Sequence, residues 1–416
     1  MINLKITIKI LIIFSTSILL EISCARVNHD IVYVDAKSAS HQDGKSWETA
    51  YTNLQDAIDK AKKGDEIWVA AGIYLPTKQF AGEGDRFKSF RLKENVILYG
   101  GFNGSETIRE ERNWNVNKTI LSGDLNGDDN DFDNNTENCY HVVTGNELDS
   151  TAVLDGFCIT AGNANDSIWP NDGGGGMTNF NGSPKITNCT FNGNAAFADG
   201  GGIRNWGDSA PMITNSIFER NRVSQEGGGI MNGPDSKAFI ANCRFFNNLA
   251  GEDGGGMYNN ESNSSIINCV FNDNLAELTG GGMYNVNGSS SKIINCTFSN
   301  NTARLKGGGL SNKVSDPVLV NCILWGNKAL SESEISNEDS KPEVSYSNIQ
   351  GGYSGFSNIN KNPNFNDSAL RLSGNSPCID AGDKSSIPTN IQKDLDLNPR
   401  IVGDNVDIGA FEYNQK

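Results

Sequence analysis

The sequence predicts an all-β protein, a right-handed parallel β-helix with a short capping helix near its N-terminal end. Three observations support this fold class. Two motifs recur together at steps of 26 or 27 residues, the chain is rich in Asn and contains 46 Gly, and only 37% of its residues are hydrophobic. Gly and Asn tolerate positive φ angles and suit a chain that turns often, whereas both are poor helix formers.

The repeat consists of two motifs that stay in phase. Gly-Gly-Gly-aliphatic-x-Asn occurs six times, and Ile-x-Asn-Cys-x-Phe follows it, with a further Asn three residues later. The aliphatic positions of the first motif are Met177, Ile203, Ile230, Met257, Met283 and Leu310. The Cys positions of the second motif are Cys189, Ser216, Cys243, Cys269, Cys296 and Cys322. Because both motifs keep their register over all copies, they mark a structural repeat.

The period of the repeat selects the architecture. A helical repeat needs 3.6-residue patterning, which Gly triplets would interrupt, and a leucine-rich repeat needs a Leu framework that this sequence lacks. A rung of a β-helix contains short strands joined by tight bends, and equivalent residues stack about 4.7–4.9 Å apart. Within the second motif, the alternation of side chains between the inside and the outside of the rung shifts by one residue at Asn. This shift predicts a bend with that Asn in the left-handed conformation.

The repeated Cys are predicted to pack in the core. A buried free Cys behaves as a small apolar residue, and Ser216 replaces one copy without disturbing the repeat. No CxxC pair or His cluster accompanies these residues, which argues against zinc. The disulfide state of Cys139, Cys158 and Cys378 stays open.

The chain divides into consecutive parts. Within the second part, an amphipathic helix at 53–62 is predicted between strands at 31–35 and 66–70, because the open end of a solenoid needs a cover. In order, the parts are a secretory signal at 1–25, an N-terminal cap at 26–80, the parallel β-helix at 81–350 with regular rungs at 174–330, and a closing module at 351–416.

The first residues predict export. Lys5 and Lys9 accompany a short apolar segment at 10–20, which is too short to span a bilayer comfortably and is typical of a cleaved signal. Cleavage after Ala25 and lipidation of Cys24, as in a bacterial lipobox, both fit this segment. We therefore expect a protein of the outer membrane, cell surface or extracellular medium, which contacts a membrane only if Cys24 is lipidated.

The net charge of the chain limits the classes of partner that it can bind. A formal charge of −16 argues against nucleic acid, because the phosphate backbone would be repelled. We expect a monomer.

Further motifs lie outside the regular rungs. Near the beginning these are Ile31-Val-Tyr-Val-Asp35, Asp43-Gly-Lys-Ser-Trp47, Gly64-Asp-Glu-Ile-Trp-Val-Ala70, Tyr99-Gly-Gly-Phe-Asn-Gly104 and Leu121-Ser-Gly-Asp124. Near the end they are Ser376-Pro-Cys-Ile-Asp-Ala-Gly382, Asn398-Pro-Arg400 and Val406-Asp-Ile-Gly-Ala-Phe-Glu412. With them the chain resembles a bacterial family of exported β-helix proteins with a choice-of-anchor Q C-terminal region. Its repeats resemble the polymorphic outer-membrane-protein type, and its rungs resemble the pectate-lyase-like superfamily. The resemblance implies the fold and a surface location, but fold does not fix function.

A candidate binding face follows the Gly triplets. If the aliphatic residue points into the core, the next residue points outward. Aromatic rings pack on the apolar faces of sugars, so this row is a candidate carbohydrate-binding surface. The alternative is an ordinary exposed strand face, where Tyr is common. The row comprises Thr178, Arg204, Met231, Tyr258, Tyr284 and Ser311.

An acidic stripe beside this row is a candidate Ca²⁺ site. Asp199, Glu226 and Asp253 each precede a Gly triplet, and stacked carboxylates repel one another unless a cation or water screens them. Ca²⁺ with oxygen ligands would resolve the repulsion. A solvated acidic edge is the alternative.

A second candidate Ca²⁺ site lies before the regular rungs. Asp124, Asn126, Asp128 and Asn130 alternate like the oxygen ligands of a Ca²⁺ loop. The EF-hand spacing is not met, and the alternative is a flexible acidic loop.

These features leave two main functions. The first is a surface-displayed scaffold that binds polysaccharide or a cell-surface glycan, or mediates adhesion. The second is a polysaccharide lyase or hydrolase that acts on an acidic glycan with the assistance of Ca²⁺. Uronate lyases of the resembled superfamily use Arg or Lys as the base, which would assign this role to Arg204. The motifs of pectate lyases and polygalacturonases are missing, and the chain has only three His, so binding is favoured. A purely structural role in the envelope is a third alternative.

Overall fold

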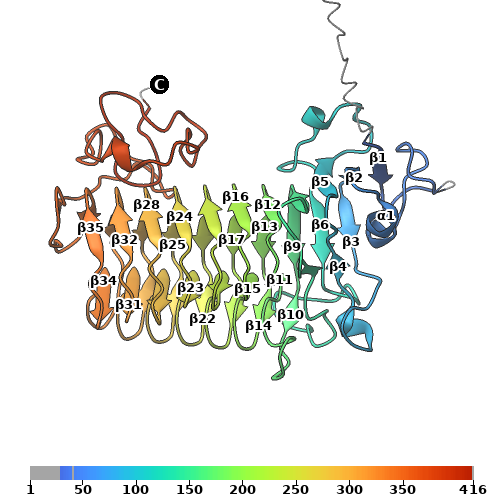
Figure 1. Ribbon diagram of the computed structural model, residues 1–416, viewed down its shortest axis with the longest axis horizontal. Helices are drawn as coiled ribbons and strands as arrows, with labels where there is room; N and C mark the ends of the chain where they lie inside the picture. The colour runs from blue at the N-terminus through green and yellow to red at the C-terminus, as the bar shows by residue number, and fades with distance from the viewer. Residues whose placement is uncertain (1–28, 40–41, 415–416) are drawn as a thin grey trace, which may run out of the picture.

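The computed structural model describes residues 29–39 and 42–414. They form a right-handed parallel β-helix with four parallel sheets and one α-helix, which confirms the predicted fold class (Figure 1). The signal segment, with Cys24 and Ala25, lies outside the described residues. None of the described helices is long and apolar enough to cross a membrane.

Two sheets extend along nearly the whole solenoid. Sheet 1 has 11 strands and sheet 2 has 10. Sheet 1 consists of β1 Ile31–Val34, β2 Glu66–Ala70, β5 Ile97–Phe102, β8 Val153–Asp155, β12 Lys185–Thr187, β16 Met212–Thr214, β20 Phe239–Ala241, β24 Ser265–Ile267, β28 Lys292–Ile294, β32 Val318–Val320 and β35 Glu343–Ser345. Sheet 2 consists of β3 Gly72–Tyr74, β6 Thr119–Ser122, β9 Phe157–Thr160, β13 Thr190–Asn192, β17 Ile217–Glu219, β21 Arg244–Phe246, β25 Val270–Asn272, β29 Thr297–Ser299, β33 Ile323–Trp325 and β36 Asn348–Ile349.

The other two sheets complete the rungs. Sheet 3, with 9 strands, contains the strands that follow the Gly triplets, and sheet 4 has 6 short strands. Sheet 3 consists of β4 Phe90–Arg91, β7 Val143–Thr144, β11 Met177–Phe180, β15 Ile203–Trp206, β19 Ile230–Asn232, β23 Met257–Asn260, β27 Met283–Val286, β31 Leu310–Lys313 and β34 Ile335–Glu338. Sheet 4 consists of β10 Asn163–Ala164, β14 Ala195–Ala196, β18 Arg222–Val223, β22 Leu249–Ala250, β26 Leu275–Ala276 and β30 Thr302–Ala303.

Stacked side chains fill the regular rungs, as the repeat predicts. The Phe rings of the second motif are parallel, and Phe245 and Phe271 have centroids 4.5 Å apart. Inside sheet 3, Asn205 Nδ2 donates to Asn232 Oδ1 of the next rung at 2.8 Å, and both residues are fully buried. Such ladders satisfy buried amides without water.

The predicted bends and core Cys are present. The Asn of the second motif is left-handed in every regular rung, with φ of 53° at Asn188 and 57° at Asn321. The eight described Cys are all free. Cys243 Sγ lies 3.3 Å from the carbonyl oxygen of Ala241. Ser216 Oγ donates to the equivalent carbonyl of Thr214 at 2.8 Å, so Ser conserves the role of Cys in the rung.

The Gly triplets allow neighbouring rungs to approach closely. A Cβ atom on Gly228 would lie 2.4 Å from the carbonyl oxygen of Gly255 on the next rung. No side chain fits at this distance, so the middle Gly is required by backbone contact rather than by a special φ angle.

The N-terminal end is covered by helix α1 (Leu54–Lys60), as predicted. The side chain of Asn53 caps it by accepting from the backbone N–H of Asp56. Its face with Leu54 and Ile58 joins the main core, because these residues would otherwise leave the first rung exposed. Strands β1 and β2 of this segment already belong to sheet 1.

The closing module lies against the side of the solenoid, beside its last rungs (Figure 1, red). Residues 351–414 contain one 3₁₀ turn, Lys384–Ser386, and little other regular structure. Amides at the rung bends hold the module: Asn295 Nδ2 donates to the carbonyl oxygen of Asp407, and Asn321 Nδ2 donates to that of Asp383, both at 3.0 Å. The remaining 3₁₀ turns, Asp85–Phe87 and Arg109–Glu111, belong to irregular early rungs.

Candidate functional site

The row of residues after the Gly triplets lies on one strip of sheet 3, as predicted. Thr178 pairs with Arg204 in register, followed on the next rungs by Met231, Tyr258 and Tyr284. The expectation that this strip is exposed is wrong, because Arg204 is 2% and Tyr258 is 8% exposed. The outward side chains pack along the strip on one another, and the rings of the two Tyr lie 5.6 Å apart. Ser311, the last residue of the row, is also buried. The strip therefore offers no open aromatic platform.

Arg204 is enclosed by a loop that precedes β11. Its Nη1 lies 2.7 Å from Asp172 and 3.4 Å from Asp199, and its Nη2 donates to the carbonyl oxygen of Pro170. A catalytic base must reach the proton that it removes. A guanidinium held in two ion pairs and closed off from solvent does not meet this requirement, so the structure corrects the assignment of Arg204 as a base. Its contacts make it a residue that fixes the loop.

The acidic stripe occupies successive rungs but does not converge on one point. Asp199 is paired with Arg204, and Asp253 accepts from the N–H and the hydroxyl of Thr279 at 2.9 and 2.7 Å. Burial raises the pKa of Asp199 to about 6, and burial together with Asp199 raises the pKa of Glu226 to about 7. In the described part of the chain, Asp199, Glu226 and Asp253 do not form a group whose carboxylates could share an ion. One ion shared by all three carboxylates is therefore not supported, and Ca²⁺ bridging two adjacent rungs stays a prediction.

The second acidic segment does form such a group. Asp124 and Asp128 lie together with Asp129 and Glu137, and these are the grouped ligand candidates that residues 29–39 and 42–414 contain. Asn126 and Asn130 are exposed. Asp124 accepts from the backbone N–H groups of Gly127, at 2.6 Å, and of the next two residues. The alternation predicted from the sequence thus identified two of these four carboxylates.

A cavity of about 280 Å³ lies at the N-terminal end of sheet 3. We call it the N-terminal cleft. Its walls come from three segments, residues 80–91, 140–147 and 170–180, and Thr178 of the predicted row is part of its lining. The cleft is where the outer surface of sheet 3 becomes accessible beside the packed strip.

Aromatic rings form much of the cleft wall. Phe80, Phe87, Tyr140 and Phe180 all line it. The rings of Phe87 and Tyr140 meet edge to face at 5.2 Å. Trp169, whose side chain is 53% exposed, packs against Phe180 at 5.6 Å. Rigid aromatic walls of this kind suit a ligand with apolar faces.

Cations outnumber carboxylates in the cleft. Arg86, Lys88 and Arg91 line it, against the single carboxylate of Glu147. Arg86 is fixed, because its guanidinium lies 4.0 Å from the Tyr140 ring centroid and its Nε donates to the carbonyl oxygen of Asn138 at 2.8 Å. Arg91 is exposed, lies 5.5 Å from the Phe80 ring and has no ion pair with any described residue. Its guanidinium is therefore available to an anionic ligand.

His141 is the one His in the cleft lining. It is buried, and its Nδ1 lies 2.9 Å from the carbonyl oxygen of Gly174. Burial, with a contribution from Arg204, lowers the pKa of His141 to about 4. The ring is neutral at physiological pH, so it offers hydrogen bonding rather than charge.

The cleft was not predicted from the sequence. Its lining comes mainly from irregular rungs, which carry no repeat to reveal their stacking. One signal was present: the segment Phe80 to Arg91 interleaves three cations with aromatic residues in a chain of net charge −16.

One family match agrees with the fold. The family described as "Right handed beta helix region" matches residues 201–375. Among solved structures, a pectate lyase aligns with a TM-score of 0.49 and 15% identity over 92% of this chain and 96% of that one. A rhamnogalacturonan lyase aligns with a TM-score of 0.40 and 12% identity over 81% and 91%. No curated protein matches the sequence. Residues 201–375 are thus identified as a right-handed β-helix region.

Proposed function

We propose that this is an exported, surface-associated β-helix protein that binds an acidic polysaccharide through the N-terminal cleft. The observation that carries the proposal is the excess of cations among aromatic walls on a protein whose net charge is −16. Aromatic faces pack on sugar rings, and a guanidinium binds carboxylates with paired hydrogen bonds. A uronate-containing glycan provides both groups.

The cleft suits binding better than catalysis. Within the described residues, Arg204 is shielded behind the loop that contains Asp172, and His141 is buried and held by a backbone carbonyl. Neither group is placed to move a proton of a bound sugar. The volume of about 280 Å³ lies near the lower end of ligand sites, about 300–1,000 Å³, which fits a short segment of a longer chain.

Export and anchoring complete the proposal. The predicted signal would deliver the protein to the outer membrane, the cell surface or the medium, and lipidation of Cys24 or cleavage after Ala25 would decide between an anchored and a released form. In either form the cleft faces the glycans outside the cell.

Binding measurements with two variants, one in the cleft lining and one in the ring beside Phe180, test the proposal. The affinity for uronate oligosaccharides and for their neutral analogues is measured by calorimetry. We expect Arg91→Gln to weaken binding of the acidic glycan by about tenfold or more, since a charge-assisted hydrogen bond contributes about 1.5–3 kcal/mol. Trp169→Ala removes a partly exposed ring beside Phe180 and is expected to weaken both acidic and neutral glycans.

The controls are residues of the same type outside the cleft. Arg304→Gln removes an exposed Arg that follows β30, and Phe356→Ala removes a ring that is 69% exposed in the closing module. Neither is expected to change the affinity. The proposal fails if no acidic glycan binds, or if the control variants weaken binding as much as the cleft variants do.

A further inference from the structure

We propose that the loop between β6 and β7 holds a divalent cation, Ca²⁺ by its donor chemistry. The ligands are the carboxylates of Asp124, Asp128, Asp129 and Glu137 with the amide oxygen of Asn138. The inference does not depend on the glycan-binding function of the cleft.

The carboxylates already lie close enough together to share one ion. One oxygen of each of Asp124, Asp128, Asp129 and Glu137 lies within 4.8 Å of the others. The loop is wound around Asp124, whose Oδ1 accepts from Gly127 and whose Oδ2 accepts from Asp129. Ca²⁺ takes six to eight oxygen ligands in flexible geometry, and a loop of this kind supplies carboxylates, amides and water.

The amide of Asn138 is a second, independent indication of a ligand. Asn138 is 1% exposed. Its Nδ2 donates to Asp129 Oδ2 at 2.8 Å, which places the amide against the carboxylate group. Its Oδ1 is buried and has no hydrogen-bond donor. Buried oxygens are nearly always paired, and a cation in the group would supply the missing partner.

Two carboxylate oxygens have the same deficit. Asp129 Oδ1 and Glu137 Oε1 are buried without a donor. The carboxylates of Asp124, Asp128 and Glu137 each place an oxygen within 4.8 Å of one of Asp129. Such crowding is unfavourable for the protein alone, because desolvated like charges repel. A divalent cation would satisfy the oxygens and offset the repulsion at once.

The acidic stripe provides a contrast within the same protein. There, Asp199 has Arg204 as its partner and Asp253 has Thr279. Among residues 29–39 and 42–414, the four loop carboxylates form no ion pair with Lys or Arg, whereas Asp131 of the same loop pairs with Arg220. Two of the three stripe carboxylates therefore have a partner within the protein, in contrast to the loop group.

The ion would fix the loop against the solenoid. Asp131, from the same loop, pairs with Arg220, and Phe132 lies 3.9 Å from the guanidinium of Arg222. On the other side, the carbonyl oxygen of Asn138 accepts from Arg86 of the cleft wall. Binding of the ion only to the folded protein must raise its stability by mass action.

Thermal unfolding and metal titration of the purified protein test the inference. We expect Ca²⁺ to raise the Tm relative to a sample in EDTA, and Mg²⁺ to raise it less, because this larger and flexible oxygen site does not suit strict octahedral geometry. Terbium luminescence would report the same site directly. In Glu137→Gln and Asp129→Asn we expect the Kd for Ca²⁺ to rise by at least about tenfold, since each substitution removes a charged ligand.

Two comparisons separate lost ligation from misfolding. In EDTA the Glu137→Gln protein is expected to unfold at or above the wild-type Tm, because a repelling charge has been removed. Asp133→Asn, which alters an exposed carboxylate of the same loop outside the group, is expected to bind Ca²⁺ like wild type. The inference is overturned if Ca²⁺ does not raise the Tm of the wild-type protein, if Glu137→Gln and Asp129→Asn still bind as wild type does, or if Asp133→Asn loses binding equally.

Discussion

At the scale of single residues, Glu226 shows how the stacking of rungs brings carboxylates together that repel one another. It lies in register between the acidic residues of neighbouring rungs, next to Asp199 along sheet 3. Burial of the carboxylate makes the largest contribution to raising its pKa from 4.5 to about 7. The negative charges of Asp199, Glu252 and Asp253 add to this effect. The same register that builds the ladders therefore also places like charges together, and Glu226 has no cation to compensate.

Replacement of Glu226 by Gln is expected to stabilise the protein at alkaline pH. The folded state holds the proton up to about pH 7, whereas the unfolded state releases it near 4.5. Wild-type stability is therefore lost as pH rises through 7, and the Gln variant avoids this loss. We expect a gain of about 1–2 kcal/mol at pH 8, discounted for partial exposure of the side chain, and none below pH 4.5. Urea unfolding across this range measures the difference.

Asp208→Asn is the control for this prediction. Asp208 is an exposed carboxylate of the rung that contains Arg204, and its replacement is expected to leave the pH profile of stability unchanged. A Glu226→Gln protein whose stability parallels that of wild type at every pH would show that the neighbouring carboxylates do not act on Glu226.

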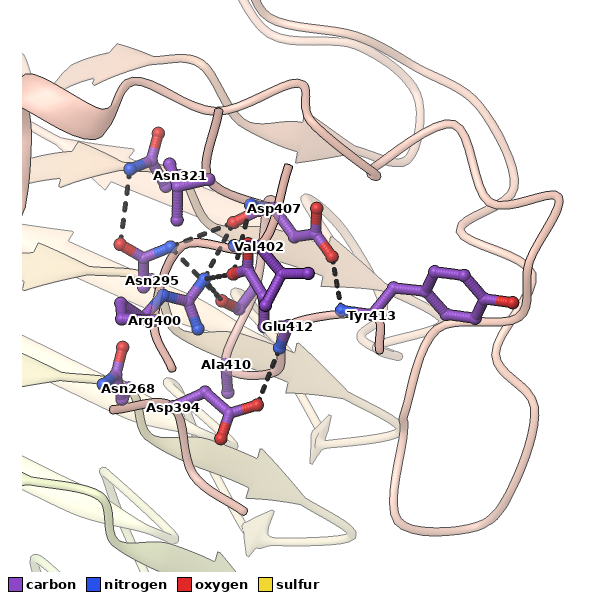
Figure 2. Close-up of polar contacts among 12 residues, drawn as sticks. Asn268, Asn295, Asn321, Asp394, Arg400, Val402, Asp407, Ala410, Glu412 and Tyr413 are labelled. Carbon is purple, nitrogen blue, oxygen red and sulfur yellow. Dashed lines mark hydrogen bonds and ion pairs between the residues drawn. The ribbon is translucent and has the colours of Figure 1, made fainter. Parts of the chain in front are cut away.

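At the scale of elements, the closing module depends on one buried cation. Figure 2 shows Arg400 among Asn295, Asp407 and Glu412. Arg400 is 2% exposed, its Nη2 donates to the carbonyl oxygen of Asp407 at 2.9 Å, and it lies 3.2 Å from Glu412 Oε2. The motifs Asn398-Pro-Arg400 and Val406-Asp-Ile-Gly-Ala-Phe-Glu412 are thus the two sides of a buried ion pair that rests on the rung bends.

Removal of this cation should release the module while the solenoid stays folded. In Arg400→Ala, Glu412 remains buried without its partner, and breaking a buried pair costs about 3–5 kcal/mol. We expect faster hydrogen exchange of backbone amides in residues 380–414, with unchanged exchange in sheets 1 to 3.

The matched control is Arg371→Ala. Arg371 pairs with Asp367 and Asp396 near the surface of the same module, with 43% of its side chain exposed. Exposed pairs contribute about 0–1 kcal/mol, so its removal should alter exchange only slightly. Equal effects of the two substitutions would mean that burial of Arg400 is not what anchors the module.

The elements also show where prediction from sequence ends. The bends at Asn188 and Asn321 were predictable because their residue type recurs at a fixed period and has one stereochemical explanation. The direction of Arg204 was also predicted correctly from the alternation of side chains. Its burial was not, because the covering loop with Asp172 belongs to no repeat. The repeat predicts which residues stack on neighbouring rungs, but it does not predict what a loop inserted between rungs will contact.

At the scale of the whole molecule, the buried strip of sheet 3 lies in the regular rungs, and the accessible N-terminal cleft lies at one end of the solenoid. In the regular rungs, side chains of the same row pack on one another, as Met231 and Tyr258 do. The repeated part of sheet 3 therefore serves as a structural scaffold. The irregular rungs supply the loops that make the N-terminal cleft, in keeping with the tendency of binding residues to lie on loops that a rigid scaffold positions. The proposed binding site therefore lies in the part of the chain where the repeat is lost.

This arrangement predicts the outcome of a lyase assay. When the purified protein is incubated with uronate polysaccharides, with and without Ca²⁺, we expect no absorbance from unsaturated products, because Arg204 is enclosed and His141 is fixed to a backbone carbonyl. A Ca²⁺-dependent product that disappears in Arg204→Ala would reverse this conclusion. It would require the loop with Pro170 and Asp172 to open and expose Arg204, and the same loop supplies part of the cleft wall. Binding and chemistry would then occur on one surface, with the loop deciding between them.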